Sequence, residues 1–156
     1  MTVRLLATFA LSSLSLAAAA QDLTWRKDIA PLVKEQCGAC HGASAPSYED
    51  WNLDRKNFEA KKIGPRMDNY TDFMRHVVWP ATGSMARRLD DGKNADGKAG
   101  NMYAFLGGDD ATRAKNLATL KAWLGGDAAW NLNRWEVRGN VPAITKDQLD
   151  KVKAKY

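Results

Sequence analysis

The sequence predicts an all-α fold, and three observations lead to this prediction. Apolar side chains recur at helical spacing in several stretches. No stretch convincingly alternates apolar and polar residues as a half-buried strand does. Glycine and proline, which favour turns, separate the helical stretches. With 156 residues, 45% of them hydrophobic and 26% charged, the chain is expected to contain one globular domain.

The first 20 residues are typical of a secretory signal peptide. Arg4 supplies a positive start, an apolar run covers residues 5–16, and small alanines follow up to residue 20. We expect cleavage before Gln21, with an uncleaved anchor as the alternative. No other stretch approaches ~18 consecutive apolar residues, so stable membrane insertion of the mature protein is not expected. The formal net charge of +5 is spread along the chain, which argues against a nucleic-acid-binding arm.

The mature domain is expected to open with residues 22–37, which contain a helix. Asp28 is its expected N-terminal cap, and Pro31 is tolerated in the first turn of a helix. Ile29, Val33 and Cys37 fall on one face at helical spacing. This helix therefore leads directly into a cysteine-containing motif.

A loop over residues 42–67, with a short helical turn at SYEDW, separates this helix from the next. The next helix, over residues 68–79, is expected to begin at Asp68 or Thr71 and to end before Pro80. Its apolar stripe consists of Tyr70, Phe73, Met74 and Val77. A second loop follows, with a short turn over residues 85–89.

The clearest helix in the chain begins after Asp109 or Asp110 and ends at the glycine pair 125–126. One face of it carries Ala114, Leu117, Leu120 and Leu124. In the remaining tail, Thr145 and Gln148 form the pattern of a capping box for a last short helix. Trp130 and Trp135 are expected to pin this tail to the body.

The stretch CGACH, residues 37–41, contains the only two cysteines of the chain and one of its two histidines. A disulfide between Cys37 and Cys40 would close too small a loop to stabilise the fold appreciably. A structural zinc site needs four ligands, and His41 follows Cys40 too closely for good geometry. A thioredoxin-like dithiol is expected in a βαβ setting, which this sequence does not indicate.

A covalently bound haem accounts for all three side chains. Two thiols at this spacing can add to the two vinyl groups of one haem, and the adjacent imidazole can bind its iron. Covalent attachment also suits an exported protein, which cannot easily recapture a lost cofactor. In such a protein Tyr48 or Trp51 could pack on the porphyrin edge or hydrogen-bond a propionate, or could belong to the core.

The order of these elements resembles that of a monohaem class I c-type cytochrome over residues 24–124. The resemblance implies an all-α fold wrapped around one haem c, histidine–methionine ligation of the iron, and electron carriage. It also implies that Cys37 and Cys40 form the thioethers and that His41 is the proximal iron ligand. The predicted organisation is a signal peptide (1–20), a cytochrome c domain (21–126) and a C-terminal extension packed on that domain (127–156).

The distal iron ligand would come from one of five side chains: Met67, Met74, Met85, Met102 and His76. A thioether favours reduced iron and raises the potential. Met85 and Met102 lie in the loop where this family places its ligand, whereas Met74 is expected to pack in the core. The stretch NMYAFLGGDD is similar to the family's methionine loop, although Tyr103 replaces the usual proline. Met102 is therefore preferred, with Met85 and a bis-histidine arrangement through His76 as alternatives.

The expected function is single-electron transfer in the periplasm between redox proteins, without bond chemistry on a substrate. If a protein side chain occupies the sixth coordination position of the iron, the iron cannot bind a substrate and can only exchange electrons. Lys34, Arg87 and Arg88 could steer acidic partners toward the haem edge. Two alternatives are a haem enzyme or gas-binding sensor with a labile sixth ligand, and a subunit that docks on a larger redox complex through its tail.

Overall fold

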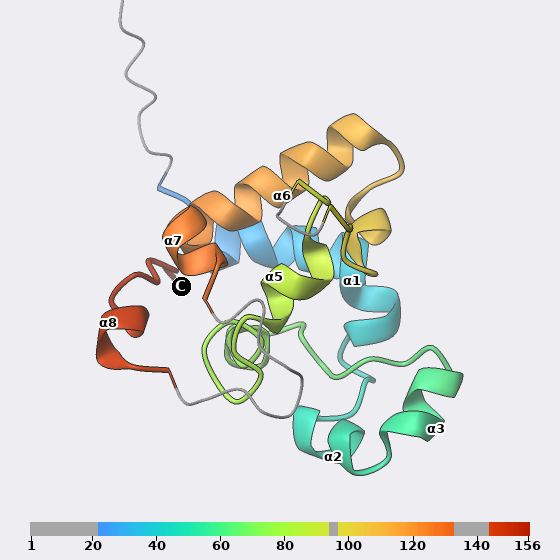
Figure 1. The fold of residues 1–156 in the computed structure, drawn as a ribbon. Coiled ribbons are helices and arrows are strands. Elements are labelled where there is room, and N and C mark those ends of the chain that lie inside the picture. Colours follow the sequence, from blue (N-terminus) through green and yellow to red (C-terminus); the bar gives the residue numbers. More distant parts are fainter. Residues whose placement is uncertain (1–21, 94–96, 133–143) are drawn as a thin grey trace, which may run out of the picture.

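The computed structural model describes residues 22–93, 97–132 and 144–156, and within these ranges the fold is all-α, as predicted (Figure 1). The predicted signal peptide lies outside the described residues. No helix within these ranges is long and apolar enough to span a membrane. The helices in chain order are η1 (Trp25–Ile29), α1 (Ala30–His41), α2 (Tyr48–Leu53), α3 (Arg55–Ala60), α4 (Tyr70–Met74), α5 (Ser84–Leu89), η2 (Tyr103–Leu106), α6 (Asp110–Leu124), α7 (Asp127–Trp130) and α8 (Lys146–Leu149).

The first helix begins at a different cap from the predicted one. The Thr24 hydroxyl accepts a hydrogen bond from the Lys27 N–H at 3.2 Å, and the Thr24 N–H donates to Asp28 Oδ2 at 2.8 Å. Thr24 is therefore the N-cap, because its extended backbone leaves its side chain free to meet the first turn. Asp28 closes the same turn from the other side, so the prediction of Asp28 as the cap is wrong. Pro31 lies in the first turn of α1, as predicted.

The middle of the chain is less helical than predicted around α4 and more helical before it. Asn69, not Asp68 or Thr71, caps α4 by accepting the Asp72 N–H at 3.0 Å. The helix ends at Met74, and residues 75–79 form turns instead of continuing to Pro80. Helix α3 occupies part of the predicted loop, and it has no buried residue, so it left no apolar period in the sequence.

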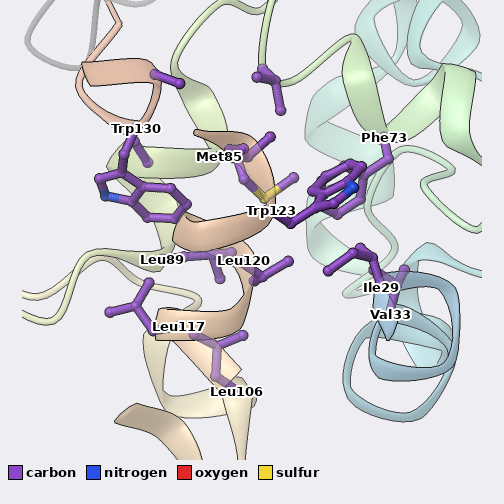
Figure 2. Packing of buried hydrophobic residues seen from close by; sticks show 14 of the residues in the cluster. Ile29, Val33, Phe73, Met85, Leu89, Leu106, Leu117, Leu120, Trp123 and Trp130 are labelled. Atoms are coloured by element: carbon purple, nitrogen blue, oxygen red, sulfur yellow. The ribbon is translucent and has the colours of Figure 1, made fainter. Parts of the chain in front are cut away.

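The core forms where η1, α4 and α6 meet (Figure 2). The Trp25 ring lies 5.3 Å from that of Phe73 and 5.9 Å from that of Trp123, measured between centroids. On α6 the buried side chains are Leu117, Leu120, Trp123 and Leu124. The predicted face is thus largely confirmed, but Ala114 is exposed and Trp123 takes part instead. Asp109 caps α6 and Gly125 ends it, as predicted.

The last six residues run along the body of the molecule. The Lys155 carbonyl accepts hydrogen bonds from the Trp25 N–H at 2.8 Å and from Trp123 Nε1 at 2.9 Å. The Lys153 N–H donates to the Leu124 carbonyl at 2.8 Å. These bonds seat the C-terminus against η1 and the end of α6, near α7 (Figure 1).

Two predictions for the tail can be compared with the structure. The capping box of Thr145 and Gln148 is confirmed at the start of α8. Trp130, 2% exposed, packs in the core cluster from α7, as predicted. Trp135 lies outside the described residues.

Candidate cofactor site

A cavity of about 1420 Å³ lies between the C-terminal end of α1, α2, α5 and the segment before η2. It exceeds the roughly 300–1,000 Å³ of pockets for drug-sized ligands, so it suits a larger group. Its lining includes both cysteines, both histidines and three of the methionines: Cys37, Cys40, His41, His76, Met67, Met85 and Met102. The fold therefore gathers nearly all the predicted site residues around one space.

His41 is held in a single orientation by the segment that follows α3. Its Nδ1 lies 2.7 Å from the Pro65 carbonyl oxygen, which can only accept, so Nδ1 carries the hydrogen. This bond leaves Nε2 as the nitrogen available to a metal. Burial lowers the pKa of His41, and the Pro65 hydrogen bond only partly opposes that effect. The imidazole is thus neutral at pH 7, which is the form that binds iron.

Gly64 leaves the space that the His41 ring occupies. A Cβ at residue 64 would lie 1.9 Å from Cε1 of His41 and 2.4 Å from its Nδ1. The Gly64 N–H also donates to the Cys40 carbonyl at 3.0 Å, which fixes this backbone against the end of α1. Gly64 and Pro65 lie within the predicted loop over residues 42–67 and are therefore site residues that the sequence analysis did not identify. The glycine–proline pair itself was the available signal.

The two cysteines lie on the rim of the same cavity. Cys37 is partly buried and Cys40 is exposed, and neither forms a disulfide. Burial, and secondarily the neighbouring Cys40, raises the pKa of the Cys37 thiol to about 11. Both cysteines thus line the cavity that His41 also lines, and the Cys37 thiol is protonated at neutral pH. Within the described residues, no three His, Cys, Asp or Glu side chains form a cluster that could hold a metal ion by themselves.

The four methionines among the predicted distal candidates occupy distinct positions. Met74 does not line the cavity and packs against the core cluster, as predicted. The Met67 N–H donates to the His41 carbonyl at 2.9 Å, so Met67 lies on the His41 side of the cavity. Met85, 6% exposed, belongs to the core cluster from α5 (Figure 2). Met102 is half-buried and lines the cavity just before η2.

The segment of Met102 is docked tightly on the end of α5. The Met102 N–H donates to the Arg88 carbonyl at 2.9 Å. A Cβ at Gly100 would lie 2.2 Å from the same carbonyl oxygen, so only glycine allows this close approach. The backbone next to Met102 is therefore fixed although the residue lies in a loop.

The charged side chains that line the cavity are mostly basic. It includes Arg55, Lys62, Arg87 and Arg88 against the single carboxylate of Glu59. A group that carries two carboxylates, as the haem does through its propionates, would meet complementary charge there. Lys34 is exposed but does not line the cavity.

The predicted aromatic residues of α2 also line the cavity. Trp51 donates its ring N–H to the Ile63 carbonyl at 3.0 Å. Because this donor is already used, Trp51 would contact a bound group by packing and not by hydrogen bonding. The Tyr48 ring lies edge-on to the His76 ring, with centroids 5.5 Å apart. The residues present thus fit a haem: two thiols, an oriented imidazole, thioethers, aromatic walls and a basic lining.

Comparison with known proteins agrees with this site. The sequence matches the PccH cytochrome c family over residues 24–156. The solved structure of the monohaem cytochrome PccH from Geobacter sulfurreducens is similar, with a TM-score of 0.73 and 43% sequence identity. That similarity covers 86% of this chain and 98% of the other. A search of curated proteins finds no match.

The family match extends through the tail, up to residue 156. The resemblance drawn from CGACH and the helix order is thereby confirmed at the level of a c-type cytochrome. The chain belongs to the PccH cytochrome c family and is an electron-transfer cytochrome with one covalently bound haem c.

Proposed function

We propose that the protein is a periplasmic single-electron carrier whose iron is held by His41 and Met102. The observation that carries this proposal is the His41 imidazole, which presents Nε2 to a cavity that both cysteines line. Cys37 and Cys40 would hold the haem through thioethers. The bound haem supplies an iron that cycles between two oxidation states. The protein contributes neutral imidazole, burial and a basic lining, all of which tune the potential.

Met102 is preferred over the other methionines for positional reasons. Both Met85 and Met102 line the cavity, but Met85 is also a buried member of the core cluster. Met102 is only half-buried and comes from a segment that is anchored through its backbone. A thioether at this position would favour reduced iron. The remaining two methionines are less suitable. The Met67 N–H donates a hydrogen bond to the His41 carbonyl, which keeps Met67 beside His41, and Met74 does not line the cavity.

Substitution of each methionine tests the ligand assignment. We expect Met102→Ala to abolish the methionine-to-iron charge-transfer band of the oxidised protein and Met85→Ala to preserve it. The reverse result would identify Met85 as the distal ligand. Carbon monoxide binding by the unmodified reduced protein would argue for a labile sixth ligand and against a pure electron carrier.

We further propose that the redox partners are acidic at their docking faces. Basic residues line the cavity, and two cavity-lining aromatic side chains are exposed to solvent: Trp79 (54%) and Phe105 (63%). An apolar contact surrounded by positive charge suits an acidic protein surface.

A further inference from the structure

His76 is a buried histidine in the cofactor cavity that no role described so far explains. It follows α4, is only 7% exposed, and lines the same cavity as His41. Its Nε2 is fully buried and has no hydrogen-bond partner among the described residues. A buried polar atom without a partner is unfavourable and requires an explanation, and a bound ligand is one such explanation. Its position points to a group bound in the cavity.

The Ser84 hydroxyl faces two groups of His76, the ring Nδ1 at 3.1 Å and the backbone carbonyl at 3.3 Å. Its single hydrogen can go to only one of them. When the hydroxyl donates to the carbonyl, it accepts from Nδ1–H, and Nε2 of the neutral imidazole then carries a lone pair; this tautomer is part of the proposal. A lone pair is what an iron ligand needs, whereas a propionate would require a donor.

The surroundings of His76 keep it neutral. Burial lowers its pKa to about 3, and positive charges nearby, those of Arg75 and Arg88 among them, add to that effect.

In this tautomer the two histidines of the chain share one arrangement. Each donates its Nδ1–H to a protein oxygen, the Pro65 carbonyl for His41 and the Ser84 hydroxyl for His76, and Nε2 remains for a ligand. We propose that His76 is a reserve iron ligand, whose Nε2 binds the iron when the thioether of Met102 is removed or displaced. The exchange breaks an iron–sulfur bond and forms an iron–nitrogen bond. No electron or proton moves, because the Nδ1 hydrogen stays on the imidazole.

This inference rests on the proposed haem function and concerns a second state of the same site. Imidazole is a harder ligand than a thioether and favours oxidised iron more strongly. The reserve state should therefore appear first in the oxidised protein.

The test compares oxidised holoprotein with Met102→Ala and with Met102→Ala/His76→Asn at neutral pH. Histidine labelled with ¹⁵N reports the number of iron-bound imidazoles by electron–nuclear double resonance, and the chain contains only two histidines. We expect Met102→Ala to be low-spin with two bound histidine nitrogens. The double variant should be high-spin with one, and it should bind added imidazole at least tenfold more tightly.

High-spin iron with a single bound histidine in Met102→Ala, and equal imidazole affinity in both variants, would overturn the proposal. Two bound histidines in the unmodified protein would refute the Met102 assignment yet support His76 as a ligand. Ser84→Ala in the Met102→Ala background provides a second variant that keeps both histidines. It should increase the high-spin fraction, and Ser84→Thr, which retains the hydroxyl, should restore the low-spin state. Circular dichroism of each variant checks that the fold persists.

Discussion

At the scale of single residues, the contact between Gly64 and His41 has the clearest consequence for function. The imidazole fills the volume that any larger side chain at position 64 would take. Glycine is needed here for space and not for an unusual backbone, because Gly64 does not have a positive φ angle. The Pro65 carbonyl next to it then fixes the ring through Nδ1. Two consecutive residues thus set both the position and the tautomer of the predicted proximal ligand.

We expect Gly64→Ala to displace the His41 ring. The added methyl group would overlap the imidazole, and overpacking of this kind costs about 1–3 kcal/mol of unfolding free energy. High-spin features should appear in the absorption spectrum, and the yield of haem-containing protein should fall. Gly108→Ala is the matched control, because a Cβ there meets nothing within 4 Å. An unchanged spectrum in Gly64→Ala would show that this contact does not position the ring.

At the scale of elements, capping residues and terminal glycines in the sequence predicted the ends of the helices in which they occur. The cap at Asp109 and the stop at Gly125 delimit α6, and a capping box starts α8. Helix α3 was missed because none of its residues is buried, so it has no apolar face that repeats at helical spacing. The start of η1 was misassigned because Thr24 and Asp28 are both good caps, and only the extended backbone of Thr24 distinguishes them.

The C-terminal segment is an element whose role the sequence left open. Residues 151–156 supply backbone acceptors to Trp25 and Trp123, which are only 4% and 2% exposed. A Cβ at Gly125 would lie 2.5 Å from the Lys151 carbonyl, so the segment also passes close to the end of α6. These contacts favour a structural role for this segment over a free docking arm.

Removal of residues 151–156 should destabilise the holoprotein by about 2 kcal/mol or more, because two buried N–H groups lose their acceptors. Urea unfolding of the truncated and full-length proteins measures this difference. Lys155→Ala is the control, since it keeps the backbone carbonyl, and it should change stability by less than about 1 kcal/mol. Unchanged stability with lost partner binding would instead identify the tail as a docking segment.

At the scale of the whole molecule, the distribution of charge matters more than its sum. The full chain carries +5, but the basic side chains that line the cavity are those that would lie beside the haem. Electrostatic steering depends on charge near the reacting site and is screened over about 10 Å at 0.1 M salt. The cavity lining should therefore govern the rate of electron exchange with charged partners.

We expect electron transfer with an anionic metal complex to slow as ionic strength rises, and transfer with a cationic complex to accelerate. Lys62→Glu, at the cavity, should lower the anionic rate several-fold at low salt, whereas Lys34→Glu, which lies elsewhere, should change it less. Stopped-flow measurements from 10 mM to 0.5 M salt give both comparisons. Equal effects of the two variants would show that only net charge matters.

The sequence alone determined the all-α class, the helix that leads into CGACH and the nature of the cofactor. Those features depend on periodicity, caps and a five-residue motif, which are all local in the chain. Only the tertiary structure decided that Gly64 and Pro65 hold His41 and that His76 shares its cavity. The tail along Trp25 and Trp123 was likewise decided only there. These contacts join residues that are far apart in the sequence, and the local sequence around one residue does not indicate which distant residue it contacts.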